Sequence, residues 1–153
     1  MRYITLTSLT TLLFLCISTA FFANNIQVNN IQITSFDPVE QYAEIQFDVS
    51  WENSWRDVNN HDAAWLFLKF LPTGSTSPWE HATLNYVNGT ADGHTAPAGS
   101  VINTSSDGKG VFIYRNVNGS GNIQFAAVRL RWNYGVDGLA NVQQADIKAF
   151  ATE

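Results

Sequence analysis

The sequence predicts an all-β domain, an antiparallel β-sandwich of about seven strands with an Ig-like or jelly-roll-like arrangement. Apolar and polar residues alternate along several short stretches, as in strands that place one face on a core and the other in water. Clusters of Gly, Pro, Asn and Asp separate these stretches and indicate turns. Aromatic residues make up 13% of the chain and charged residues only 14%, a composition that disfavours a disordered chain and a helical bundle.

Residues 1–20 have the pattern of a secretory signal peptide. Arg2 precedes the uncharged, mostly apolar stretch Ile4–Ala20, and small residues lie at the end of that stretch. We expect cleavage after Ala20, with cleavage after Ala23 as the second choice and an uncleaved membrane anchor as the alternative. The mature chain would be a single β-sandwich domain of residues 21–153, secreted or held at the cell surface.

Removal of the signal peptide would also change the chemistry of the chain. Cys16 is the only cysteine, so the mature chain would have no disulfide, no thiolate metal site and no cysteine nucleophile. Loss of Arg2 lowers Lys plus Arg from 8 to 7 against 13 acidic residues, a net charge of −6. This acidic balance argues against nucleic acid as a partner and against a membrane role beyond export.

The first expected strand changes phase in its middle. Ile26 and Val28 alternate with polar residues, and Ile31 and Ile33 do so in the opposite phase. A bulge or bend at Asn29–Asn30 would keep both apolar pairs facing inward.

Two strands are expected in the centre of the chain. Tyr42–Trp51 alternates with a period of two and has one wet face. After a polar loop, Ala63–Leu71 is interrupted only by Lys69, and such a nearly continuous apolar run predicts a central strand buried on both faces.

The second half of the chain contains four more expected strands: Trp79–Tyr86, Val111–Arg115, Ile123–Tyr134 and Gln143–Ala151. The third of these changes phase at Ala126–Ala127, where we expect a bulge or a crossing between the sheets. The stretch Val87–Gly110 is rich in Gly, Thr, Ser and Asn and is expected to be a long loop, either functional or loosely ordered.

The loop after Trp55 offers oxygen ligands for a metal ion. Asp57, Asn59 and Asp62 lie within six residues, and carboxylate and amide oxygens suit Ca²⁺. The spacing lacks the glycine and the terminal glutamate of a known calcium loop, and Asn/Asp-rich loops commonly cap their own backbone. We therefore predict no cofactor, with Ca²⁺ as the alternative.

Aromatic residues near loops suggest a ligand-binding platform. Trp55, Trp79 and Tyr86 could stack on sugar rings if they were exposed together, or they could fasten loops to the core. We expect the other tryptophans of the mature chain, Trp51, Trp65 and Trp132, to fill the sandwich core.

No motif of a catalytic site is evident. The three histidines, at positions 61, 81 and 94, are not spaced as metal ligands, and no serine lies in a nucleophile-elbow motif. A hydrolase is the least supported class, and we predict that the chain is not an enzyme.

Several blocks of residues resemble a secreted module of Bacteroidota-type bacteria: Phe47–Arg56, Asn60–Lys69, Trp79–Leu84, Gly93–Gly99, Gly110–Arg115 and Val128–Gly135. In such proteins the module is followed by a domain similar to formylglycine-generating, sulfatase-modifying-factor enzymes. The resemblance covers nearly all of the mature chain and implies a junction near Ala149–Glu153. Catalysis in that enzyme family uses a cysteine pair and copper, so the mature chain carries no residue for it.

These observations favour an exported, non-catalytic β-sandwich module for recognition or scaffolding, accessory to a formylglycine-generating-enzyme-like domain. The expected partner is a protein domain or a cell-surface glycan. The alternatives are a carbohydrate-binding module that uses loop aromatics and a cell-surface subunit that self-associates through strand edges.

Overall fold

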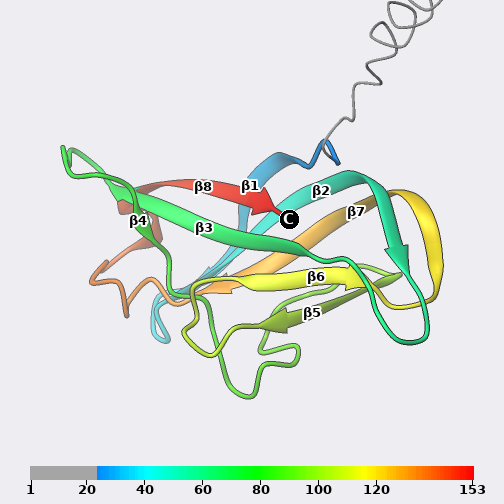
Figure 1. Ribbon diagram of the computed structural model, residues 1–153. Helices are drawn as coiled ribbons and strands as arrows, with labels where there is room; N and C mark the ends of the chain where they lie inside the picture. Colours follow the sequence, from blue (N-terminus) through cyan, green and yellow to red (C-terminus); the bar gives the residue numbers. More distant parts are fainter. Residues whose placement is uncertain (1–23) are drawn as a thin grey trace, which may run out of the picture.

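The computed structural model describes residues 24–153, in which two antiparallel sheets pack face to face (Figure 1). Sheet A has the order β1-β2-β7, with β1 at Gln27–Asp37, β2 at Tyr42–Arg56 and β7 at Gly119–Trp132. Sheet B contains β3 at Ala64–Pro72, β4 at Glu80–His81, β5 at Ser100–Thr104, β6 at Val111–Arg115 and β8 at Ala145–Thr152. A single 3₁₀ turn, η1 at Val142–Gln144, precedes β8. The prediction of an antiparallel β-sandwich is confirmed.

Strand β3 is the centre of sheet B. It pairs with β8 on one side, from Trp65 to Pro72. On the other side its first residues pair with β6 and its last residues with β4, and β5 follows β6. Within residues 24–153, no helix has the length and apolar character needed to cross a bilayer. The predicted signal peptide and both of its cleavage sites lie outside the described residues.

Strand β2 is the clearest confirmed element. Its inward residues are at most 1% exposed: Ala43, Ile45, Phe47, Val49 and Trp51. From the facing sheet, Phe70 approaches Trp132 of β7 with 5.3 Å between the ring centroids. Trp51 and Trp132 therefore lie in the core as expected.

The phase change in β7 is a β-bulge. Phe47 pairs with Val128 and Val49 pairs with Phe125, so Ala126 and Ala127 are accommodated against one residue of β2. Ala127 has a φ of 57°, and its N–H donates to the Asp48 carboxylate at 2.8 Å. This hydrogen bond is the main reason why the pKa of Asp48 is lowered. The bulge keeps both halves of β7 facing the core.

The prediction for β1 is confirmed only in part. A register shift follows Asn29, and Asn30 has a φ of 56°, so the bulge is present. Val28 packs against the core and Ile33 lies opposite the core residue Ile45, so members of both pairs face inward as expected. Ile31 and Ile33 are nevertheless each 40% exposed, because β1 is the outermost strand of sheet A in the described part of the chain.

The prediction for β3 also needs correction. Leu66, Leu68 and Phe70 are buried, whereas Trp65 and Phe67 on the opposite face are only half-buried. The strand is therefore covered on one face, and Trp65 does not belong to the core. Large aromatic side chains on the outer face made the apolar run continuous in sequence.

The stretch expected as a long loop has a structural role in closing the sandwich. Thr95 pairs with Arg129 of β7, and Thr90 pairs with Asn103 of β5. The segment therefore connects the edge of sheet A to the edge of sheet B. The expected strand Trp79–Tyr86 is reduced to β4 and a bridge between Leu84 and Trp132. Strand β5 lies within the stretch that was expected to be a loop and was not predicted.

Candidate functional site

The outer face of sheet B carries a row of aromatic side chains from three strands. We call this surface the aromatic face and define it as Trp65 and Phe67 of β3, Phe112 and Tyr114 of β6, and Phe150 of β8. Trp65 pairs with Phe112 across the strands, with 4.7 Å between ring centroids. Phe67 and Phe150 are stacked at 5.2 Å with an interplanar angle of 10°. Cross-strand register therefore brings residues distant in sequence into one surface.

The aromatic face is open to solvent. Phe112 is 45% exposed and Phe150 39%, while Trp65, Phe67 and Tyr114 are half-buried. The indole of Trp65 lies against Gly110, where an added Cβ would come within 2.3 Å of the ring. The absence of a side chain at position 110 thus leaves room for the indole.

One end of the aromatic face carries polar groups close to the rings. His61 stacks on Tyr114 with 4.1 Å between ring centroids, and the Arg56 guanidinium lies 5.4 Å from the same ring. The Asn103 side chain donates a hydrogen bond to the Tyr114 hydroxyl at 2.8 Å. The other end has His81, 5.3 Å from Phe67. Burial lowers the pKa of His81, and the charges of nearby lysines act in the same direction.

The three predicted ligand-binding aromatics do not form one platform. Trp55 is 40% exposed at the end of β2, and its backbone N–H donates a hydrogen bond to the carboxylate of Asp62, just before β3 begins. Trp79 precedes Glu80, which pairs with Phe70 near the opposite end of β3. Six strand residues at about 3.3 Å each separate the two ends by roughly 20 Å.

Tyr86 lies at a third place, and Trp79 has a partner of its own. Tyr86 is 42% exposed and contacts the turn at Gly89. The Lys148 ammonium lies 4.2 Å from the centroid of the Trp79 ring. Since Lys148 belongs to β8, Trp79 is the one predicted platform residue that borders the aromatic face.

The predicted calcium ligands serve the loop that contains them. The Asp57 carboxylate accepts hydrogen bonds from the backbone N–H groups of Asn59 and Asn60, both at 2.7 Å, which lowers its pKa. Asp62 accepts from Trp51 Nε1 at 2.9 Å, from Ser54 Oγ and from the Trp55 N–H. Within residues 24–153, no group of three or more acidic, histidine or cysteine side chains could hold a metal ion. The loop geometry matches the backbone-capping interpretation.

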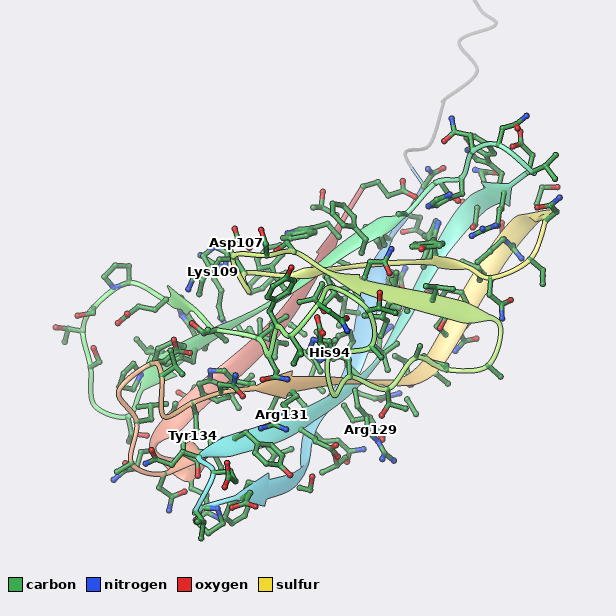
Figure 2. All side chains as sticks on the ribbon, turned by 90° about the horizontal axis from the view of Figure 1, so that it is seen from below. His94, Asp107, Lys109, Arg129, Arg131 and Tyr134 are labelled. Carbon is green, nitrogen blue, oxygen red and sulfur yellow. The ribbon has the colours of Figure 1, made fainter. Side chains whose placement is uncertain are left out.

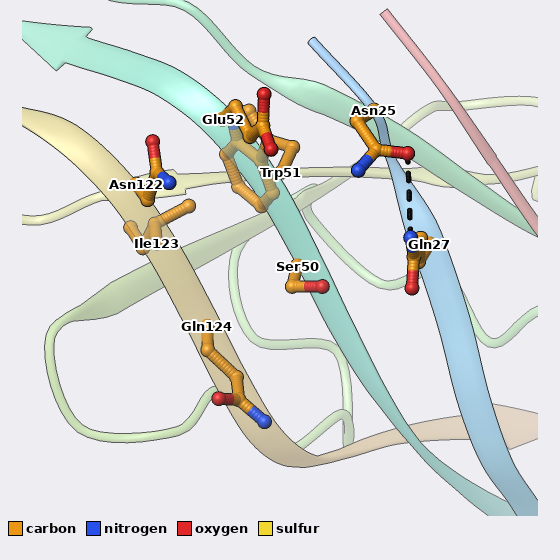
Figure 3. A pocket seen from close by; sticks show the side chains of 8 residues that line it. All are labelled: Asn25, Gln27, Ser50, Trp51, Glu52, Asn122, Ile123 and Gln124. Carbon is orange, nitrogen blue, oxygen red and sulfur yellow. Dashed lines mark hydrogen bonds between the residues drawn. The ribbon is translucent and has the colours of Figure 1, made fainter.

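A polar hollow of about 410 Å³ lies on sheet A (Figure 3). It is lined by Asn25, Gln27, Ser50, Trp51, Glu52, Asn122, Ile123 and Gln124. The only aromatic residue in this lining, Trp51, is 1% exposed and directs its indole N–H to Asp62. The hollow offers hydrogen-bonding groups but no ring face on which a sugar could stack.

His94 acts within the fold rather than in an open site (Figure 2). Its Nδ1 accepts a hydrogen bond from the Arg131 backbone N–H at 2.9 Å, and the residue is 8% exposed. Burial is the largest cause that lowers the pKa of His94 to about 4. The imidazole fastens the segment around Thr95 to β7 and stays neutral at neutral pH.

The aromatic face was missed in the sequence, although one signal for it was present. Trp65, Phe67 and Lys69 have the same parity in β3, and Lys69 is the residue expected on a face that reaches water. Comparisons with models of protein families, with curated proteins and with solved structures found no match to this chain. The resemblance to the secreted module stays a prediction.

Proposed function

We propose that this chain is an exported, non-catalytic β-sandwich module that acts in recognition or scaffolding, with the aromatic face as its contact surface. One observation carries the proposal: two aromatic pairs lie on the same outer face of sheet B, with 4.7 Å between the ring centroids of Trp65 and Phe112 and 5.2 Å between those of Phe67 and Phe150. Soluble proteins rarely leave such a surface without a binding role, and aromatic residues are enriched at protein interfaces.

A protein domain fits this surface better than a glycan. Phe67, Phe112 and Phe150 have no polar group with which to orient a sugar hydroxyl. Lys69 and Lys148 lie on the same face as the rings and supply charge around an apolar centre. An apolar centre with a charged rim is the usual anatomy of a protein–protein contact.

The formylglycine-generating-enzyme-like domain is the partner that we propose. Phe150 lies in β8, three residues before Glu153, and faces outward beside Phe67. A domain joined after β8 would therefore begin next to the aromatic face. In this arrangement the module would position the domain while taking no part in its chemistry.

The test begins with the DNA downstream of the Glu153 codon. An in-frame continuation into such a domain supports the accessory role, and a stop codon there contradicts it.

The domain and residues 21–153 are then expressed as separate chains, and their affinity is measured by calorimetry. Phe150→Ser should weaken binding by about tenfold or more, because it removes a solvent-exposed ring of the contact surface and its stacking partner for Phe67. Val58→Ser, at a loop residue that is 87% exposed, is the control and should leave the affinity unchanged.

Carbohydrate recognition is the second candidate, and one local observation favours it. The ring of Tyr114 has His61, Arg56 and Asn103 around it, so hydrogen-bonding groups lie beside an aromatic ring. Glycan-array binding that is lost in Tyr114→Ala and retained in Phe150→Ser would support this candidate over the protein partner.

A further inference from the structure

Strand β1 forms an open edge of the sandwich. Among residues 24–153 it is the outermost strand of sheet A and pairs only with β2. The other outer strand of the sheet, β7, is covered by the segment that pairs with it at Thr95. In Figure 1, β1 lies beside β8 at the side of the sandwich opposite to β5. The backbone groups on the outer side of β1 are therefore available to another strand.

The sequence of β1 has few of the features that protect edge strands. The stretch from Gln27 to Phe36 contains no charged residue and no proline. Natural edge strands are commonly blunted by lysine, proline or bulges. The bulge after Asn29 is the one such device in the strand's first half, and the register shifts again after Ile33. The pairing surface is thus short, which favours a single defined partner strand over open-ended stacking.

The same edge presents apolar side chains that are only partly covered. Ile31 and Ile33 are 40% exposed and Phe36 is 46% exposed. Ile33 pairs with Ile45 and Phe36 pairs with Ala43, both core residues, so these side chains lie on the inward side of the sheet. A hollow of about 370 Å³ separates them from Val142 of η1. An added strand would place alternate side chains into this hollow.

We propose that β1 pairs antiparallel with β1 of a second copy of this chain, so that two copies of sheet A form one continuous sheet of three strands from each. The hollow is lined by uncharged residues, and the Gln27–Phe36 stretch of β1 is itself extended and uncharged and carries apolar side chains, so a second copy supplies a matching strand. A twofold axis near Gln32 would place Ile31 of each copy opposite Ile33 of the other. Pairing of β-branched residues across strands is favourable, and the ten-residue uncharged stretch brings no like charges together.

The twofold arrangement uses the β1 edge of both copies and is therefore closed. It also leaves the aromatic face of each copy free, because that face belongs to sheet B. The dimer would present two such faces and is independent of the partner proposed above.

Sedimentation velocity of residues 21–153 over a wide concentration range tests the proposal. The wild-type chain should sediment as a dimer at the higher concentrations. Ile33→Lys should sediment as a monomer, because it places a charge in the apolar hollow. Val39→Lys adds the same charge at a residue that is 86% exposed and lies just beyond β1, and it should remain dimeric. Near-UV circular dichroism establishes that both variants are folded.

Two outcomes overturn the proposal: a wild-type monomer at every concentration, or a dimer that persists in Ile33→Lys. Hydrogen exchange of the wild-type chain gives the same answer without a substitution, because amides between Gln32 and Asp37 should become more protected as concentration rises. Phe150→Ser separates this contact from the aromatic face. If that variant alone were monomeric, the copies would associate through sheet B and the β1 pairing would be wrong.

Discussion

At the residue scale, His94 has a pKa lowered far enough to make stability depend on pH. Its pKa is about 4 in the folded chain and near 6.5 when the side chain is exposed. Asp92 acts in the opposite direction, while burial and the Arg131 charge favour the neutral ring. The folded state therefore binds a proton at His94 less readily than the unfolded state does.

We expect the free energy of unfolding to fall as the pH decreases from 6.5 toward 4. The unfolded chain gains the proton first, so the neutral folded form loses its advantage across this window. The full contribution is present above pH 6.5 and amounts to at most about 3.5 kcal/mol, since the two pKa values differ by roughly 2.5 and each tenfold difference in proton affinity corresponds to about 1.4 kcal/mol. Urea unfolding at about pH 7 and about pH 4.5 measures the loss and avoids the range in which carboxylates with lowered pKa are protonated.

His94→Asn is the matched control, because the Asn Oδ1 can accept the Arg131 N–H as Nδ1 does but cannot be protonated. His81, whose pKa is also lowered, is retained in this variant, so the difference between the two pH profiles belongs to His94. Equal pH dependence in the variant and the wild type would contradict the assignment.

At the element scale, the packing of β3 on the start of β6 depends on Gly110. A Cβ at this position would lie 2.3 Å from the Trp65 ring and 2.8 Å from the Leu66 carbonyl oxygen, so the indole and the strand would have to move. We expect Gly110→Ala to destabilise the fold by about 1–3 kcal/mol and to shift the indole resonance of Trp65 in an NMR spectrum.

Gly119→Ala provides the comparison for that substitution. At the start of β7, a Cβ on Gly119 would approach only the Arg115 side chain, at 3.9 Å. Its stability should equal or slightly exceed that of the wild type, because alanine restricts the unfolded chain. If the two variants lost the same free energy of unfolding, the loss in Gly110→Ala would come from the backbone, and the indole would not depend on this contact.

Elements with strict alternation could be predicted from the sequence, and elements defined by their neighbours could not. In β2, each inward residue from Ala43 to Trp51 is buried as its parity indicates. In β3, the apolar run concealed a solvent-facing side, because aromatic residues satisfy an apolar pattern whether or not another layer covers them. Strand β5 has polar residues at Ser100 and Thr104 on its buried face, so no apolar alternation marked it.

The candidate site was difficult to predict for a related reason. Phe112 and Phe150 come from separate strands, and only the pairing of β3 with both β6 and β8 brings them to the same face. The sequence placed Trp55, Trp79 and Tyr86 near loops correctly, but their distances from one another depend on the length of β3. Residue type can suggest a binding surface, whereas its continuity is a property of the sheet.

At the scale of the whole molecule, the fold depends on contacts between distant parts of the chain. Ala43 of β2 pairs with Trp132 of β7, and the Tyr134 hydroxyl donates to the Asp37 carbonyl oxygen 97 residues away. Thr95 pairs with Arg129 of sheet A and Thr90 pairs with Asn103 of sheet B, so this segment joins the two sheets. Such topology requires the closure of long loops before the pairing contacts are made.

We therefore expect the mature chain, residues 21–153, to refold from urea slowly, in roughly milliseconds to seconds, as do other sandwiches dominated by non-local pairing. Stopped-flow tryptophan fluorescence measures the rate, since Trp51 and Trp132 become fully buried on folding. Because Cys16 lies within the predicted signal peptide, the rate should be the same with and without a reductant. Refolding in microseconds would mean that local contacts govern the rate, against the topology.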